Sequence, residues 1–148
     1  MPNLVLSVAL SGALASVASA GAHHATVAAS IDDASAGLDA KARAANIETI
    51  KRVLATIDGK PLRSRHLDVA VGGFTMTSVA ERVEITAQIR VAISDRHGKM
   101  LAIVTGTATA EVPRATFRWS QLPRYRRDAL TAATQSALGR VLRERIAR

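Results

Sequence analysis

The feature that most constrains the fold is a strict alternation of apolar and polar residues from Glu81 to Ser94. Successive side chains of a strand point to opposite faces of a sheet, so this repeat predicts a strand with one buried face and one polar face. The apolar side consists of Val83, Ile85, Ala87, Ile89, Val91 and Ile93. The polar side consists of Arg82, Glu84, Thr86, Gln88 and Arg90.

This strand is predicted to be the first half of a long hairpin over about residues 81–112. Asp95–Lys99 is typical of a turn, in which Gly98 can adopt a positive φ. Met100–Val112 then returns as a second long strand, which Pro113 ends.

A third strand is predicted at His66–Met76. Its apolar residues alternate up to Val71 and resume on the opposite parity after Gly72-Gly73. A change of face at paired glycines is typical of a β-bulge, so we expect a bulge at this position.

Two helices are predicted from apolar residues at helical spacing. The first runs over about Ala44–Ile57 and ends at Asp58-Gly59-Lys60-Pro61, because glycine and proline commonly follow a last helical turn. The second is expected to run from a Ser120 cap to about Ile146. The expected buried residues of the first helix are Ile47, Ile50, Val53, Leu54 and Ile57. Those of the second are Leu122, Ala129, Leu130, Ala133, Ala137, Leu138, Val141, Leu142 and Ile146.

The order helix, strand, hairpin, helix predicts an α+β fold. In this fold an antiparallel sheet of three to four strands is packed on one face by an N-terminal and a C-terminal helix. The chain has 148 residues, enough for one ordinary domain, and we assign residues 44–148 to it. Residues 21–43 are expected to be a flexible lead-in, because Ala25–Lys41 is rich in Ala, Ser and Asp. The strand edges and the open face of the sheet leave a homodimer as one option.

Residues 1–20 are interpreted as a signal peptide. Leu4–Ala20 is apolar and ends in Ala18-Ser19-Ala20, the small-residue pattern of a signal peptidase site. Met1-Pro2-Asn3 lacks the usual basic residue, so an upstream start, an atypical signal and no signal at all stay open. With export the protein is expected to be periplasmic or secreted, with no transmembrane span in the mature chain. Without export it is expected to be cytoplasmic.

The composition excludes several classes of site. The chain has no Cys, which excludes disulfides, thiolate zinc sites, Cys nucleophiles and lipid attachment at an N-terminal Cys. His23-His24 is interpreted as part of a solvated tail, and His66 and His97 as surface histidines. Motifs of serine hydrolases, phosphate-binding loops, zinc proteases and dinucleotide-binding folds do not occur. We therefore predict no catalytic residue, no metal and no cofactor.

The candidate binding site is a basic and aromatic segment that follows the hairpin. Between Arg114 and Arg127, five arginines are interleaved with three of the four aromatic residues of the chain, which carries a net charge of +8. Guanidinium groups bind phosphate bidentately, and aromatic side chains supply stacking or interfacial anchoring. The candidate contacts are Arg114, Arg118, Trp119, Arg124, Tyr125, Arg126 and Arg127. In the structural alternative, the aromatic residues plug the end of the sheet and the arginines are solvated.

The segment Val83–Ile146 contains a strand ending V-A-I-S, a D-x-x-G-K turn, a long return strand, V-P, a basic stretch and a helix. This outline resembles small α/β domains of bacterial envelope assembly proteins, such as curli-secretion-like and lipopolysaccharide-assembly lipoproteins. Those relatives usually carry a lipid-attachment cysteine, which this chain lacks, so the resemblance implies a soluble periplasmic or secreted form.

The resulting hypothesis is a non-enzymatic, exported binding or assembly module of the bacterial cell envelope. It would contact a partner protein or an anionic envelope component through the Arg and aromatic residues. A cytosolic nucleic-acid-binding domain is the first alternative, although nucleic acid is the less favoured partner. A small enzyme with a site not visible in the sequence is the second alternative.

Overall fold

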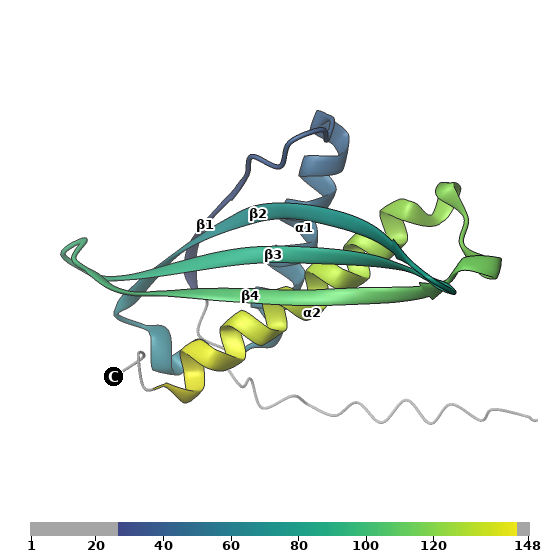
Figure 1. The fold of residues 1–148 in the computed structure, drawn as a ribbon. Helices are drawn as coiled ribbons and strands as arrows, with labels where there is room; N and C mark the ends of the chain where they lie inside the picture. Colours follow the sequence, from purple (N-terminus) through teal and green to yellow (C-terminus); the bar gives the residue numbers. More distant parts are fainter. Residues whose placement is uncertain (1–26, 145–148) are drawn as a thin grey trace, which may run out of the picture.

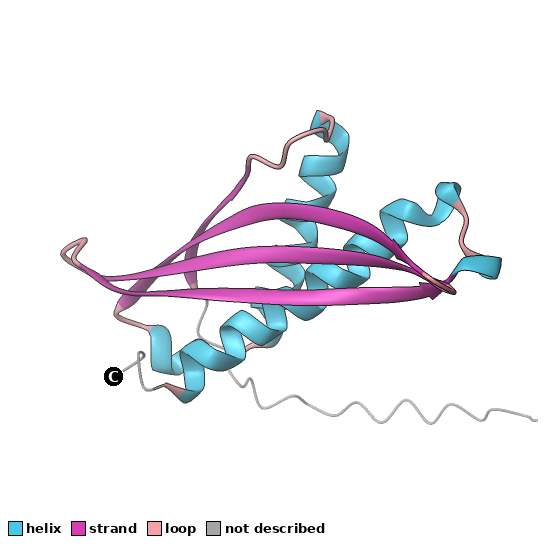
Figure 2. Cartoon of the chain, in the orientation of Figure 1, coloured by secondary structure: helices cyan, strands magenta, loops and turns pink. Residues whose placement is uncertain are grey.

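The structure, a computed structural model, describes residues 27–144. The interpretations of residues 1–20, of His23-His24 and of Ile146 lie outside the described residues. One four-stranded sheet carries both long helices on the same face (Figure 1), and the remaining segments are short (Figure 2). The elements are β1 (Ala28–Asp33), α1 (Ala40–Thr56), η1 (Lys60–Leu62), β2 (Arg65–Val79), β3 (Arg82–Asp95), β4 (Met100–Pro113), η2 (Arg114–Thr116), η3 (Trp119–Gln121) and α2 (Leu122–Arg143).

The predicted α+β fold class is confirmed. The strands β2, β3 and β4 are antiparallel neighbours, and the sheet order is β1-β2-β3-β4. The strand β1 was not expected: it runs parallel to β2 and places Ile31 opposite Val69. The expectation of a flexible lead-in over residues 21–43 therefore does not hold for the residues of β1. Ala and Asp are depleted in strands, so this six-residue segment carries little strand signal of its own.

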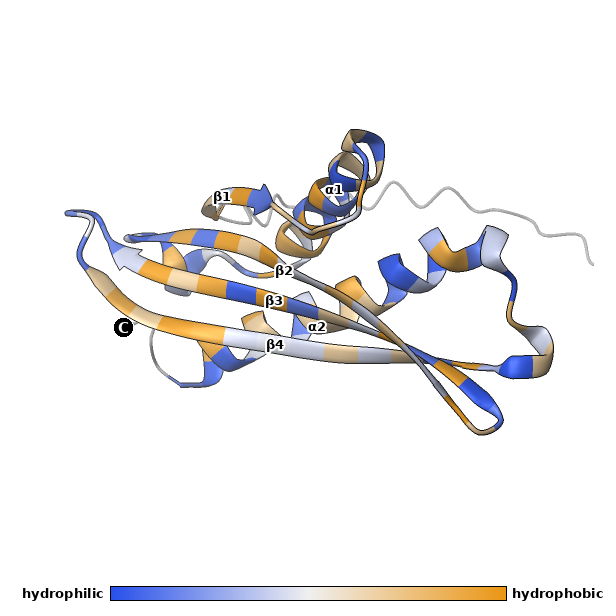
Figure 3. Ribbon diagram, turned by 45° about the horizontal axis from the view of Figure 1, so that its top comes forward, coloured by the Kyte–Doolittle hydropathy of each residue, from blue (hydrophilic) through white to orange (hydrophobic). Residues whose placement is uncertain are grey.

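The strand β3 lies at the centre of the core, as its alternation predicts. Its six helix-facing residues are each at most 5% exposed, and Ile85, Ile89 and Ile93 are at most 1% exposed. The alternation of hydrophobic and hydrophilic residues along the strands is visible in Figure 3. The sheet therefore has the buried face and the open face that its period of two residues predicts.

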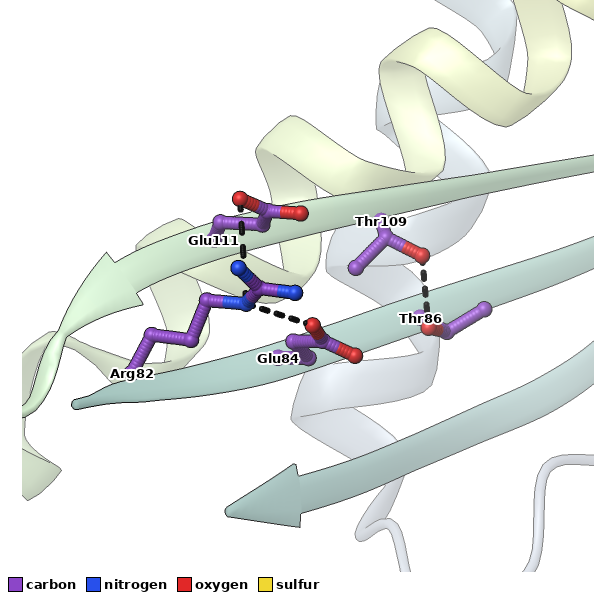
Figure 4. A network of polar contacts seen from close by, with 5 residues as sticks. All are labelled: Arg82, Glu84, Thr86, Thr109 and Glu111. Carbon is purple, nitrogen blue, oxygen red and sulfur yellow. Dashed lines mark hydrogen bonds and ion pairs between the residues drawn. The ribbon is translucent and has the colours of Figure 1, made fainter. Parts of the chain in front are cut away.

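The open face of the sheet is polar where β3 begins and β4 ends, and polar contacts hold it there (Figure 4). The Nε atom of Arg82 lies 2.7 Å from a carboxylate oxygen of Glu84 and 4.0 Å from one of Glu111. The hydroxyl groups of Thr86 and Thr109 are 2.7 Å apart. The Arg82–Glu111 and Thr86–Thr109 contacts join β3 to β4 on the side that neither α1 nor α2 covers.

The predicted bulge in β2 is confirmed at Gly72-Gly73. Val71 lies opposite Ile89, yet Gly73 lies opposite Gln88, so one residue of β2 is left over. Gly73 has φ of +136°, a conformation that favours glycine. The extra residue keeps Phe74 on the helix-facing side of the sheet, where it packs against the core.

The turn between β3 and β4 is organised by the carboxylate of Asp95. Its Oδ1 atom accepts hydrogen bonds from the backbone N–H groups of His97 (2.8 Å) and Lys99 (3.0 Å). The Lys99 N–H group, and then that of His97, lowers the pKa of Asp95, because both stabilise the charged form. Gly98 takes the predicted positive φ, at +79°.

The helix α2 packs closely on β4 because both contribute small residues. A Cβ atom built at Gly106 would lie 2.2 Å from the carbonyl oxygen of Ala133 and 2.8 Å from the Cβ of Ala137. The predicted buried face of α2 is confirmed from Ala129 to Val141, but Leu142 is 36% exposed. Neither helix within residues 27–144 has the length and hydropathy needed to cross a membrane.

The predicted Ser120 cap was wrong. The helix α2 begins at Leu122, and Gln121 at the cap position makes no side-chain hydrogen bond to the first turn. Ser120 instead lies within η3, a single 3-10 turn that ends directly before α2. A serine caps a helix when its own backbone is extended, and here Ser120 is inside a 3-10 turn and Gln121 takes the cap position with helical dihedral angles.

The free edge of β4 is long and uncharged. Between Met100 and Ala110 the strand contains no charged residue, and within residues 27–144 no strand pairs with the outer side of β4. The Nη1 atom of Arg140 on α2 donates a hydrogen bond to the carbonyl oxygen of Thr105 at 3.1 Å. Arg140 thereby places a positive charge beside an edge that otherwise invites strand pairing.

A buried polar contact joins the end of β1 to α1. Asp33 is 6% exposed and accepts hydrogen bonds from the Ser35 N–H (2.9 Å) and from Nδ2 of Asn46 (2.7 Å). Asp39 caps the helix by accepting from the Ala42 N–H at 2.7 Å. The two aspartates fix how α1 leaves β1 and therefore where the outer surface of α1 faces.

Candidate anion-binding site

The segment that carries the aromatic residues of the predicted site follows the end of β4 (Figure 1), and Phe117 and Tyr125 pack on this end of the sheet. The rings of Phe117 and Tyr125 are stacked with centroids 5.7 Å apart. Both rings pack on Val83, Ile85 and Val112, which form a second, smaller core. These two rings therefore cover the end of the sheet, which is the structural role considered as the alternative to binding.

Trp119 behaves differently from its aromatic neighbours. It stands edge-on to Phe117, with centroids 5.2 Å apart and planes at 82°, and it is 67% exposed. The η3 turn holds the backbone here, since the Gln121 N–H donates to the Arg118 carbonyl at 3.0 Å. Nearby, the hydroxyl of Tyr125 donates to Oε1 of Gln121 at 2.7 Å. Trp119 is therefore an exposed ring on an ordered support.

Three of the predicted arginines converge on a groove between α1 and the start of α2. The groove has a volume of about 610 Å³. Arg124, Arg126 and Arg127 line it from α2, and Arg52 lines it from α1. The one carboxylate among its lining residues is that of Glu48. We call these four arginines the groove arginines.

The carboxylate of Glu48 forms its ion pair with Lys51, which is not one of the groove arginines. Nζ of Lys51 lies 2.9 Å from it, and this hydrogen bond is the main reason that the pKa of Glu48 is lowered. The charge of Lys51 and, more weakly, that of Arg52 lower the pKa further. Glu48 is thus held in its charged form without a close ion pair to any groove arginine in the described part of the chain.

Two of the groove arginines have weak partners. Nε of Arg124 lies 3.9 Å from Oδ2 of Asp128, an exposed pair of the kind that contributes little. The guanidinium of Arg126 lies over the ring of Phe74, 5.9 Å from its centroid. Across residues 27–144, Arg52 and Arg127 have no carboxylate within 4.0 Å. The groove therefore presents guanidinium groups that can still accept an anion.

The groove continues along the helix pair. A smaller hollow of about 240 Å³ adjoins it and shares Thr49, Arg52 and Arg127 with it. Arg52 and Arg127 therefore stand at the junction of the two hollows, one on each helix. Opposed guanidinium groups on rigid helices suit a ligand that carries phosphate.

The structure does not bring every predicted residue to the groove. Arg114 lies in η2, and its N–H donates to the carbonyl of Glu81 at 2.7 Å. Nη1 of Arg118 donates to the carbonyl oxygens of Phe117 (2.9 Å) and Ala115 (3.3 Å). These two arginines stand at the aromatic end of the sheet, beside Trp119 rather than in the groove.

Sequence reasoning missed Arg52. It lies off the apolar stripe of its helix, which marks it as exposed and says nothing about a partner. The signal that identifies it is the packing of α1 beside α2, which requires the tertiary structure. Once the helices are adjacent, the polar face of α1 and the basic first turns of α2 border the same groove.

His66 lies beside a carboxylate that also contacts a serine. Nε2 of His66 lies 3.2 Å from Oδ1 of Asp68, which also accepts a hydrogen bond from the hydroxyl of Ser30. All three side chains are on the open face of the sheet, and the serine bonds to the carboxylate rather than to the imidazole. In a catalytic triad the histidine contacts the nucleophilic hydroxyl. Here the carboxylate lies between the two, so these three residues are not arranged as a triad.

The sequence matches no family model and no curated protein. Solved structures do match. A minor lipoprotein from Acinetobacter baumannii is similar over 81% of this chain and 93% of its own, with a TM-score of 0.51 and 16% identity. The chain has the fold of a small bacterial lipoprotein. This confirms, at the level of fold, the resemblance inferred from the hairpin and terminal helix.

Two further structures show weaker likeness. A lipoprotein candidate from Caulobacter crescentus CB15 has a TM-score of 0.47 and 15% identity, over 78% of this chain and 87% of that chain. Lipoprotein GNA1162 from Neisseria meningitidis has a TM-score of 0.34 and 11% identity, over 66% and 88%. These proteins are named for a lipid anchor, whereas the present sequence contains no cysteine to which a lipid could be attached.

Proposed function

We propose that this protein is an exported module of the bacterial cell envelope that binds a phosphate-bearing envelope component. Two observations support the location: the fold is shared with the lipoprotein of Acinetobacter baumannii, and Leu4–Ala20 has the pattern of a signal peptide. The single observation that carries the binding role is the convergence of the four groove arginines in one hollow.

The chemistry of the groove favours an anion with several oxygens. Guanidinium groups present paired N–H donors that match the geometry of phosphate, and they stay charged at every physiological pH. A volume of about 610 Å³ lies within the range of ordinary small-molecule sites. A phosphorylated headgroup or sugar fits this combination of size and charge.

We propose binding rather than catalysis. The described lining residues include two hydroxyl side chains, Thr49 and Ser120. The hydroxyl of Thr49 donates to the carbonyl of Ala45 at 2.9 Å, and neither His66 nor His97 lines the groove. A nucleophile paired with a base is the arrangement that would favour an enzyme.

The test is a titration with pyrophosphate, a soluble probe of phosphate chemistry, followed by NMR. We expect shifts at the backbone amides of Arg52 and Arg127, with binding weakened at least tenfold in the variant R124A/R126A/R127A, since a hydrogen bond to a charged group contributes about 1.5–3 kcal/mol. The matched control R90A/R96A/R143A removes the same charge outside the groove. Equal weakening in the two variants would show that net charge, not the groove, binds the probe.

A further inference from the structure

The single tryptophan of the chain is an exposed feature that the groove does not use. Trp119 is 67% exposed, more than any other exposed large hydrophobic residue in the described part of the chain. Tryptophan is highly buried on average in folded proteins. The ring contacts Phe117 and its backbone lies in the η3 turn, so the fold holds Trp119 in this exposed position.

Other exposed apolar residues stand at the same end of the sheet. Met76 is 46% exposed and Val79 is 40% exposed, both near the end of β2. The turn after β2 lies beside η2, since the Arg114 N–H donates to the carbonyl oxygen of Glu81. We call the exposed apolar residues at this end of the molecule, Met76, Val79 and Trp119, the apolar tip; Met76 and Val79 are on opposite faces of β2, and Trp119 is the most exposed of the three.

Basic residues flank Trp119 along the chain. Arg114 and Arg118 stand in the same segment, and Ser120, the residue after Trp119, already lines the groove. The acidic residues nearby are Glu81, in the turn after β2, Glu84 and Glu111, which both lie beside Arg82, and Asp128, which faces Arg124. Tryptophan prefers the boundary between headgroups and acyl chains, and basic residues are drawn to anionic lipid surfaces.

We infer that the phosphate-bearing partner is an anionic lipid bilayer, on which Trp119 inserts at headgroup level while the groove arginines bind lipid phosphate. This inference rests on the proposed function and names the partner of the same site. The tip supplies apolar burial and the arginines supply charge complementarity, a pairing that a soluble phosphate does not require. A protein partner would cover Trp119 without a need for phosphate.

The experiment uses the fluorescence of Trp119 in the full chain, where no other tryptophan contributes. The probes are vesicles of phosphatidylglycerol mixed with phosphatidylcholine, and vesicles of phosphatidylcholine alone. We expect a shift of emission to shorter wavelength, and quenching by brominated acyl chains, with the anionic vesicles only. The signal is local to Trp119, so adsorption of another part of the chain does not reproduce it.

The variant W119S is expected to bind anionic vesicles at least about tenfold more weakly in sedimentation, from the loss of one buried aromatic side chain. The matched control is I103S, which removes an exposed apolar side chain, 54% exposed, on β4. Both replaced side chains are largely exposed, so both variants should melt at the temperature of the wild type. Binding of I103S should stay within twofold of wild type.

Unshifted and unquenched Trp119 emission with bound vesicles would overturn the inference, as would equal weakening by W119S and I103S. The pyrophosphate titration separates this failure from that of the proposed function. If pyrophosphate binds the groove while Trp119 stays in water, only the lipid surface is wrong. If pyrophosphate does not bind, the groove itself is not an anion site.

Discussion

Replacing Gly106 with alanine tests directly how α2 packs on β4. The added Cβ atom would lie 2.2 Å from the carbonyl oxygen of Ala133 and 3.0 Å from the backbone nitrogen of Ala137. Both atoms belong to the helix backbone and cannot rotate away. Non-bonded heavy atoms prefer about 3.5 Å, so α2 must retreat from β4 by about 1.3 Å at this point.

That retreat loosens the tightest part of the core. Leu130, Ala133, Ala137 and Val141 are fully buried on the face of α2 that would move. Overpacking of a well-packed core costs about 1–3 kcal/mol, and a clash with backbone belongs at the upper end. We expect G106A to lower the free energy of unfolding by about 3 kcal/mol. At about 4 °C per kcal/mol for a domain of this size, the melting temperature falls by about 12 °C.

The assay is urea and thermal unfolding followed by circular dichroism, with G139A as the control. Gly139 is on α2, and the nearest atom to its added Cβ is the flexible end of Arg143, at 3.4 Å. The same substitution there should raise the free energy of unfolding by about 0.5–1 kcal/mol, because alanine favours the helix. A G106A protein as stable as wild type would refute the close packing of α2 on β4.

Two further predictions concern buried and edge contacts. D33A removes the acceptor of the Ser35 N–H and of a helix side-chain amide, and should lower the free energy of unfolding by about 3 kcal/mol; an unchanged urea midpoint would contradict the role of this contact. R140A frees the Thr105 carbonyl at the β4 edge and should increase concentration-dependent self-association in sedimentation velocity. R143A, which removes the same charge from the same helix, should leave self-association unchanged.

The sequence predicted the elements whose patterns are set by burial on one face. The apolar alternation of β3 and the shift of parity at Gly72-Gly73 both follow from which side chains face the helices. The stripe of α2 was predicted for the same reason. The exposure of Leu142 was not predicted, because a periodic pattern does not reveal where the sheet beneath a helix ends.

The parts that were missed depend on tertiary contact. The segment that forms β1 is polar and small, and it becomes a strand because β2 offers a partner. The candidate site shows the same limit. The run from Arg114 to Arg127 indicated a basic surface, but its division into a groove and an apolar tip depends on η3 and on the position of α1. Arg52 joins the groove through helix packing alone.

The parallel pairing of β1 has a consequence for the order in which this chain assembles. Each of β2, β3 and β4 meets its neighbour through a short turn, whereas β1 must wait for β2, since Ala28 lies opposite His66. During synthesis the N-terminal strand therefore emerges long before its mate exists. A segment of alanine, serine and aspartate with one isoleucine can stay in water over that interval without sticking to other chains. The weak strand signal of β1 thus fits a segment that pairs only after β2 has been synthesised.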